Sequence, residues 1–308
     1  MRLKQLFTLL LFVAYTGVSA QDFIALWPAG KKPNNNGRSI KDSLANERIW
    51  KVETPGVYSF LVPQAENSRT AVLLCPGGGY ERISHIYNGF NMAKWYNSIG
   101  VNAFVLIYRL PHQVDLQHRE TAGLQDAQRA MQLIRSKAET WKIDPHKVGV
   151  MGTSAGGHLA SLLGTSEADI TGQKDSVAQS DFKPDFMVLL SPVISMGAFA
   201  HPGSRKNFLA GDTSAAMVEK YSTDRRVTEM TPPTFMVHAF NDKTVPVKNS
   251  LFFYEALIAH NINASLHIFP QGGHGIRLDE NPGSTDLWTA LLEKWLKEMN
   301  FLVPIPFK

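Results

Sequence analysis

Short, continuous apolar runs recur along this chain, and a longer stretch with a helical spacing of apolar residues follows most of them. The runs are apolar almost throughout rather than alternating, which is typical of strands that are covered on both faces. The predicted strands are Ala71–Cys75, Val101–Tyr108, Lys147–Met151, Phe186–Ser191, Thr234–Phe240 and Ser265–Phe269.

The stretches between these strands predict helices. In one of them Ala127, Ala130, Met131 and Ile134 recur at steps of three or four, so one helix face packs on the sheet. Alternation of strand and helix implies right-handed crossovers, and the fold class is therefore α/β, with a mostly parallel central sheet and helices on both faces. The predicted helices are Asn88–Ile99, Thr121–Thr140, the segment after Ser154, Lys248–His260 and Thr285–Asn300.

The flanking segments complete one domain. Residues 21–46 are rich in Asn, Gly, Pro and Lys and are predicted to be an extension that lies over the domain as a loop. Glu47–Val52 and Val57–Pro63, joined by a Pro-Gly turn, are predicted to pair antiparallel at the sheet edge. Residues 47–308 are predicted to form one α/β domain, in which 192–233 are an irregular insert in position to cover a site.

Residues 1–20 have the layout of a secretory signal peptide, with a positive start, an apolar stretch and the small residues Val18–Ala20 at a cleavage site. The apolar stretch is short for a membrane-spanning helix, so we expect cleavage before Gln21, export, and no membrane attachment afterwards. A single cysteine, Cys75, cannot form an internal disulfide. Export without disulfides favours a bacterial periplasm.

Composition and charge narrow the class of partner. Hydrophobic residues make up 44% of the chain and charged residues 19%, as in folded globular proteins. Cleavage of the signal peptide removes two of the 31 basic residues and leaves 29 against 27 acidic ones, a formal charge of +2. So small a charge gives no support to nucleic-acid binding.

The segment Gly152–Gly156 reads Gly-Thr-Ser-Ala-Gly and lies between a predicted strand and a predicted helix. A nucleophile elbow lies between a strand and a helix in this way. Its turn is so tight that only glycine fits two residues before and two residues after the serine. The following helix points its first N–H groups toward the site. The pattern indicates a nucleophile at Ser154 rather than an ordinary glycine-rich turn.

A serine hydroxyl needs a base to become a nucleophile at neutral pH. Asp242 follows one late strand and His274 follows the next, in the chain order of an α/β-hydrolase triad. Each alone suits an ordinary loop or turn. Together, at the carboxyl edge of the sheet where ligands bind, they predict a triad with Ser154.

The glycines after strand Ala71–Cys75 let backbone N–H groups approach a substrate closely. The N–H groups of Gly78, Gly79 and Ala155 are predicted to form an oxyanion hole. A phosphate-binding loop is the alternative, but no Gly-Lys-Ser/Thr sequence follows. Nor does any His/Cys/Asp group have convincing zinc spacing, so neither a metal nor a cofactor is expected.

Some side chains beside these motifs are candidates for binding the substrate, although ordinary packing explains their positions equally well. They are Tyr80, Met196 and Arg277, with Phe199. Among the histidines, His85 and His201 are candidates for the site opening, whereas His158, His238 and His267 are predicted to be structural.

The motifs CPGGGY, FVLIYRLP, GTSAGGHLAS, TPPTFMVHAFNDKTVPVKNS and LHIFPQGGHGIRL resemble α/β-hydrolases of the esterase/lipase type. The resemblance covers nearly all of the chain after residue 20 and is greatest to the bacterial carbohydrate acetyl-esterase-like group, which is related to hormone-sensitive lipase. It implies a serine carboxylesterase that removes acetyl groups, and in some members feruloyl groups, from plant polysaccharides such as xylan. An acetylated oligo- or polysaccharide is then the expected partner.

The chain departs from that family pattern in two places. Cys75-Pro76 stand where hormone-sensitive-lipase-like esterases usually carry a histidine, so support for the following glycines must come from elsewhere. The helical N-terminal cap of those esterases is not predicted here, which favours an open site.

Three alternatives stay open at this point. One is another serine hydrolase of the same fold, such as a feruloyl esterase, a lipase or a peptidase. Another is a glycoside hydrolase, which needs two opposed carboxylates. The third is a non-catalytic carbohydrate-binding homologue.

Overall fold

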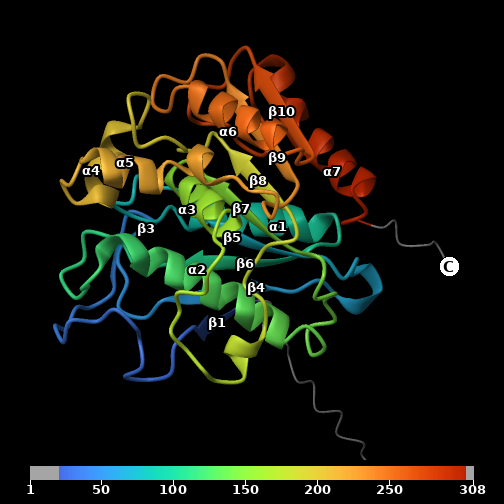
Figure 1. Ribbon diagram of the computed structural model, residues 1–308. Helices are drawn as coiled ribbons and strands as arrows, with labels where there is room; N and C mark the ends of the chain where they lie inside the picture. The colour runs from blue at the N-terminus through green and yellow to red at the C-terminus, as the bar shows by residue number, and fades with distance from the viewer. Residues whose placement is uncertain (1–20, 303–308) are drawn as a thin grey trace, which may run out of the picture.

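The computed structural model describes residues 21–302, so the predicted signal peptide lies outside the described residues. An eight-stranded sheet runs through the molecule (Figure 1). Neighbouring strands from β6 to β10 pair in parallel, whereas β1 and β4 join antiparallel at one edge. In spatial order the strands are β1 (Asp22–Ala25), β4 (Gly56–Phe60), β6 (Asn102–Ile107), β5 (Ala71–Cys75), β7 (Val148–Thr153), β8 (Met187–Leu190), β9 (Thr234–Ala239) and β10 (Ala264–Phe269). The predicted mostly parallel sheet is confirmed.

Burial explains why the apolar runs became strands. Every residue of β5, β6, β7, β8 and β9 is buried, as expected for strands with helices on both faces. The edge strand β10 differs, because most of its residues are half-buried and Ile268 is exposed. Full coverage was therefore a wrong expectation for β10, which has a neighbour on only one side.

Helices cover the two faces of the sheet. On one face α2 packs against α3 (Figure 1). On the other face α1 and α7 meet, where the ring centroids of Trp95 and Trp288 lie 6.1 Å apart. A π-helical turn, Ile86–Phe90, precedes α1. The helices are α1 (Asn91–Ser98), α2 (Arg119–Ser136), α3 (Ala155–Gly164), α6 (Lys248–Ala259) and α7 (Trp288–Glu298), with 3-10 turns at Gln64–Glu66, Val177–Gln179 and Gly283–Leu287. None of the helices in residues 21–302 combines the length and the hydropathy that crossing a membrane requires.

The N-terminal strands pair differently from the prediction. Strand β3 (Arg48–Lys51) does not pair with β4 but forms a separate hairpin with β2 (Ser43–Ala45). The two residues between them, Asn46 and Glu47, have φ of 51° and 57°, which suits a tight hairpin turn of the type that matches strand twist. Strand β4 instead pairs with β1 and β6.

Residues 21–46 are therefore not all loop. Strand β1 belongs to the main sheet, and the Trp27 indole N–H donates to the buried carboxylate of Asp126 on α2 at 2.8 Å. These contacts attach the extension to the domain.

The insert, residues 192–233, is not irregular throughout, contrary to the prediction. It contains α4 (Pro202–Leu209), α5 (Ala215–Tyr221) and a 3-10 turn at Thr223–Arg226. His201 caps α4, with Pro202 as the first helical residue, and Ser214 caps α5. Both capping residues, and the proline after the first, are local signals for a helix start that the sequence itself carries.

Candidate active site

Ser154 lies at the sharp turn from β7 into α3. Its backbone has φ 57° and ψ −122°, a conformation that L side chains rarely adopt. The turn is tight enough that a Cβ on Gly152 would lie 2.1 Å from the Gly156 carbonyl oxygen. A Cβ on Gly156 would lie 2.0 Å from the carbonyl oxygen of Cys75. Glycine is thus required at both positions, and the serine has the geometry of a nucleophile elbow.

The loops after β9 and β10 bring two side chains to this serine. His274 Nε2 lies 2.8 Å from Ser154 Oγ, and His274 Nδ1 lies 2.7 Å from Asp242 Oδ2. The three residues are far apart in sequence, but their strands end at the same edge of the sheet. The His274 side chain is 23% exposed and that of Asp242 is fully buried, so the chain of hydrogen bonds runs from the surface inward.

Asp242 is held as a carboxylate by several donors. Its Oδ1 accepts the backbone N–H groups of Thr244 and Val245, both at 2.9 Å. Burial raises the pKa of Asp242, but hydrogen bonds from His238 and His274 outweigh it and hold the pKa below its ordinary value. A carboxylate that stays ionised can orient the imidazole of His274 and stabilise its positive form.

Residues 77–84, which we call the glycine loop, present backbone donors beside the serine. The Gly77 carbonyl accepts the N–H of Ser84 at 2.9 Å, and the Gly78 carbonyl accepts the N–H of Glu81 at 3.1 Å. Because N–H and C=O point in opposite directions across a trans peptide, these bonds turn the N–H groups of Gly78 and Gly79 away from the loop interior. Neither N–H has a protein acceptor within residues 21–302.

A buried chain of hydrogen bonds supports the glycine loop from below. Tyr80 Oη lies 2.7 Å from His158 Nδ1, and His158 Nε2 lies 2.7 Å from the Tyr221 carbonyl oxygen at the end of α5. A carbonyl only accepts, so Nε2 carries the hydrogen and Nδ1 accepts from Tyr80. Burial lowers the pKa of His158 to about 4, which keeps the ring in this neutral form.

Two further contacts hold the loop from its sides. Asn207 on α4 donates through Nδ2 to the Gly79 carbonyl at 2.8 Å. The buried Tyr108 hydroxyl donates to the Pro76 carbonyl at 2.8 Å. The support that Cys75-Pro76 could not provide therefore comes from α3, the insert and the end of β6.

A cavity of about 370 Å³ opens at the serine. Polar side chains and the apolar Ile276 both contribute to its wall: Arg82, Tyr87, Asn88, His201, Asn207 and Thr244 line it together with Ser154, His274, Gly78 and Gly79. Both predicted glycine donors and two members of the predicted triad thus border one space. Within residues 21–302 no group of three or more His, Cys, Asp or Glu side chains is arranged to hold a metal ion.

A family comparison agrees with this geometry. The model of the BD-FAE family matches residues 59–257, which is more than half of the chain. The chain belongs to the BD-FAE family. The matched region of this BD-FAE protein contains Ser154, Asp242 and the glycine loop, and His274 follows it.

Relatives of this BD-FAE protein include an acetylxylan esterase of Xylanibacter ruminicola, 33% identical over 243 residues, or 77% of the chain. An endo-1,4-beta-xylanase B of Butyrivibrio fibrisolvens is 31% identical over 79% of the chain. The chain spans about half the length of the first of these and 39% of the second. A crystal structure titled acetyl ester-xyloside bifunctional hydrolase, from Caldicellulosiruptor lactoaceticus, matches with a TM-score of 0.80 at 35% identity, covering 94% of this chain and all of the other. The α/β-hydrolase fold is confirmed.

The predicted substrate-binding residues do not line the cavity of this BD-FAE domain. Tyr80 and Met196 are buried, at 1% and 0% exposure, and neither is among the residues that line the cavity. Arg277 is exposed, but its neighbour Ile276 is the one that faces the cavity. Phe199 packs on Phe252 instead. Proximity in sequence did not reveal the direction of these side chains.

The histidines divide into those that line the cavity and those that do not. His201 lines the cavity, as expected for one of the two candidates, whereas His85 is buried and does not border it. His158 and His238 are fully buried and bonded, as predicted, and His267 is only half-buried on the edge strand β10. The roles of His238 beside Asp242 and of Asn207 beside Gly79 were missed, because only the folded chain brings them to the site.

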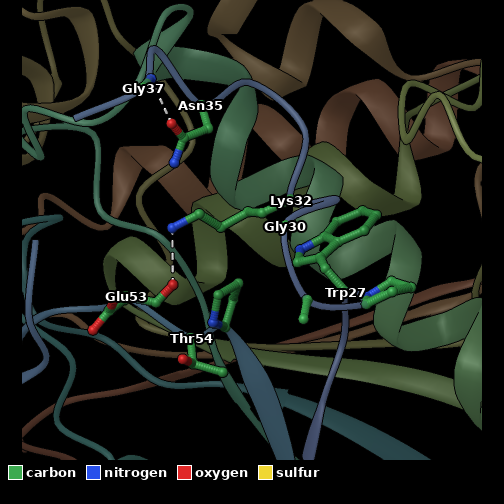
Figure 2. A pocket seen from close by; sticks show the side chains of 10 residues that line it. Trp27, Gly30, Lys32, Asn35, Gly37, Glu53 and Thr54 are labelled. Carbon is green, nitrogen blue, oxygen red and sulfur yellow. Dashed lines mark hydrogen bonds between the residues drawn. The ribbon is translucent and has the colours of Figure 1, made fainter. Parts of the chain in front are cut away.

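A larger cavity, of about 590 Å³, lies away from the triad (Figure 2). It is formed by the N-terminal extension around Trp27 and Gly30 and by the segment Glu53–Pro55. Lys32 crosses it, donating to the Glu53 carbonyl at 2.8 Å and pairing with Asp115 at 3.0 Å. No triad residue and no glycine-loop residue lines this space, so the volume alone does not mark the reactive site.

Proposed function

We propose that the protein is a serine carboxylesterase that removes acetyl groups from carbohydrate, with xylan or a related plant polysaccharide as substrate. One observation carries the proposal: the hydrogen-bonded series Ser154–His274–Asp242, at 2.8 and 2.7 Å, beside the backbone donors of the glycine loop. This arrangement matches the requirements of acyl transfer through a serine nucleophile.

The chemistry follows from the positions of the groups. Ser154 Oγ attacks the ester carbonyl while His274 Nε2 takes its proton, and Asp242 stabilises the positive imidazole. The N–H groups of Gly78, Gly79 and Ala155 donate to the negative oxygen. His274 then returns the proton to the leaving sugar oxygen, and a water molecule releases acetate by the same route. No cofactor takes part.

The proposed substrate class is supported by the relatives and by the cavity. The names acetylxylan esterase and acetyl ester-xyloside hydrolase belong to relatives that are 33% and 35% identical to the chain. The side chains of Arg82, Asn88 and Asn207 at the cavity wall carry hydrogen-bonding groups that a hydroxylated alcohol can use.

The geometry favours this reading over a glycoside hydrolase. That reaction needs two carboxyl groups facing each other across the bond that breaks. Among the described residues that line the cavity, Glu81 is the one with a carboxyl side chain, and Asp242 lies buried behind His274.

Replacing the nucleophile tests the proposal. Ser154→Ala should lower kcat for acetate release from acetylated xylan by roughly 10⁵–10⁶, because the remaining groups cannot form an acyl-enzyme. The thermal midpoint should change little, and Ser176→Ala, at an exposed serine, should keep full activity. Acetate release by Ser154→Ala at the wild-type rate would refute the assignment. Release of reducing ends from deacetylated xylan would support the glycosidase alternative instead.

The export of the protein to the periplasm stays a prediction from residues 1–20. Its support is the signal-like layout of that segment.

A further inference from the structure

His201 lies at the amino end of α4 and borders the cavity that contains Ser154 and His274. Its ring lies near two glycines, Gly79 and Gly203. A Cβ on Gly203 would meet His201 Cε1 at 3.1 Å, and a Cβ on Gly79 would meet the same atom at 3.9 Å. The insert thus places one imidazole beside the glycine loop.

The capping bond decides which nitrogen of His201 carries hydrogen. Nδ1 accepts the backbone N–H of Ser204 at 3.2 Å and lies 2.8 Å from the Ser204 hydroxyl. A backbone N–H can only donate, so Nδ1 has a lone pair and the hydrogen of the neutral ring is on Nε2. Nε2 has no protein acceptor within residues 21–302, which leaves it as a donor at the cavity.

Electrostatics keeps this ring neutral. Burial lowers the pKa of His201, and the neighbouring His274 lowers it further, against a smaller opposite effect of Asp242. A neutral donor is compatible with its neighbour, because His274 becomes positive during the proposed reaction and a second positive ring beside it would oppose that change.

The oxygen that this donor meets is narrowed by elimination. In a sugar acetate the carbonyl oxygen accepts hydrogen bonds from the backbone N–H groups of Gly78, Gly79 and Ala155. The ester oxygen that leaves receives its proton from His274. The acetyl methyl group cannot accept a hydrogen bond. The remaining acceptors are the hydroxyl, ring and glycosidic oxygens of the alcohol part, and a hydroxyl on the neighbouring carbon is among those nearest to the ester.

We propose that His201 is a specificity-determining residue whose Nε2–H donates to the hydroxyl oxygen next to the ester, so that the site selects acetates of vicinal diols, the pattern of a sugar ring. This rests on the proposed esterase function and adds to it a residue and a structural feature of the substrate.

Two variants of His201 separate the donor from the cap. His201→Asn keeps an oxygen that can cap α4 through the Ser204 N–H, but its amide is too short to reach the Nε2 position. His201→Gln extends an amide N–H toward the Nε2 position and loses the capping geometry. Lys206→Ala, an exposed neighbour on α4, is the matched control.

The probes are trans-2-hydroxycyclohexyl acetate and cyclohexyl acetate, which differ only in the neighbouring hydroxyl. The measured quantity is the ratio of their kcat/KM values, because intrinsic reactivity cancels when this ratio is compared between proteins. His201→Asn should lower the ratio about five- to tenfold, the effect of one hydrogen bond. His201→Gln should recover part of it, and Lys206→Ala should keep the wild-type ratio.

An unchanged ratio in His201→Asn overturns the proposal, as does an equal loss on both esters, which would mark a purely structural role. Either result leaves the esterase assignment intact, because both esters are still hydrolysed by the wild-type protein. Failure of the wild-type protein to hydrolyse either ester would overturn the esterase function and this inference with it. Thermal midpoints of the variants verify that α4 is folded.

Discussion

His158 links three parts of the site through one buried ring. It accepts from Tyr80 of the glycine loop, donates to the Tyr221 carbonyl of the insert, and itself belongs to α3, directly after the serine. The bond from Tyr80 requires the neutral imidazole, because a protonated ring has no lone pair on Nδ1 to accept it, whereas the bond to the Tyr221 carbonyl is possible in either state. The position of the backbone donors therefore depends on the protonation state of a residue that never meets the substrate.

This dependence predicts a loss of stability in acid. The pKa of His158 is lowered from 6.5 to about 4 in the folded chain, so between these values the unfolded chain binds a proton that the folded chain does not. The free energy of unfolding should be unaffected by this group above pH 6.5. It should fall by on the order of 3 kcal/mol as the pH approaches 4.

Denaturant unfolding of the wild type, His158→Gln and the exposed control His146→Gln measures this at pH 7.5 and 4.5. The loss between the two pH values should be clearly smaller in His158→Gln, which has no group to protonate at that position. An equal loss in all three proteins would assign the acid sensitivity to other groups.

At the scale of elements, the site is assembled from the ends of β7, β9 and β10 and closed by the insert after β8. Helix α4 and its N-cap approach the glycine loop at two points: the His201 ring lies beside Gly79, and the Asn207 amide donates to the Gly79 carbonyl. The same helix therefore supplies a wall of the cavity and fixes a peptide beside the predicted oxyanion donors.

Removing the second contact should slow the chemical step. In Asn207→Ala the Gly79 carbonyl loses its donor, and the loop is held less firmly where small displacements are costly, so we expect kcat to fall about tenfold or more. KM should change less than kcat. Steady-state kinetics on an activated acetate ester measures kcat and KM. Lys206→Ala, at the adjacent preceding position on α4, is the control. A rise in KM alone would mean that Asn207 contacts the substrate rather than the loop.

For the whole molecule, a buried ion pair joins the N-terminal extension to the catalytic domain. Arg109, just after β6, pairs with Asp126 on α2 at 2.9 Å, and both side chains are fully buried. Asp126 also accepts the indole N–H of Trp27 from the extension. Three segments that are distant in sequence thus depend on one carboxylate.

Asp126→Ala should destabilise the protein by about 3–5 kcal/mol, because Arg109 keeps its charge without its partner in a buried position. The double variant Arg109→Met/Asp126→Leu should recover much of the loss, since apolar residues need no partner there. Chemical denaturation measures both free energies. If the single variant were as stable as the wild type, the pair would not hold the extension in place.

Local and periodic signals in the chain sufficed for the parallel strands of the sheet, most helices and the three triad positions, but not for β1 or for the pairing of β3. Strand β5 is predicted to the residue. Ser154 directly follows β7, and Asp242 and His274 lie in the loops after β9 and β10, which the topology of a parallel sheet brings to the same edge. A glycine two residues either side of Ser154 follows from the steric limits of one turn, which involves few residues. Such constraints can be recognised from the sequence alone because they act over short stretches of the chain.

The surroundings of the triad arise only in the folded chain. Asn207 meets Gly79 across 128 residues, and His201 meets the same glycine because the insert crosses back to the sheet edge. Tyr80 and Met196, adjacent to the motifs, turn into the core, because backbone direction and packing decide where a side chain points. Long-range packing has no period along the chain, and it is packing that sets the shape and the donors of this cavity.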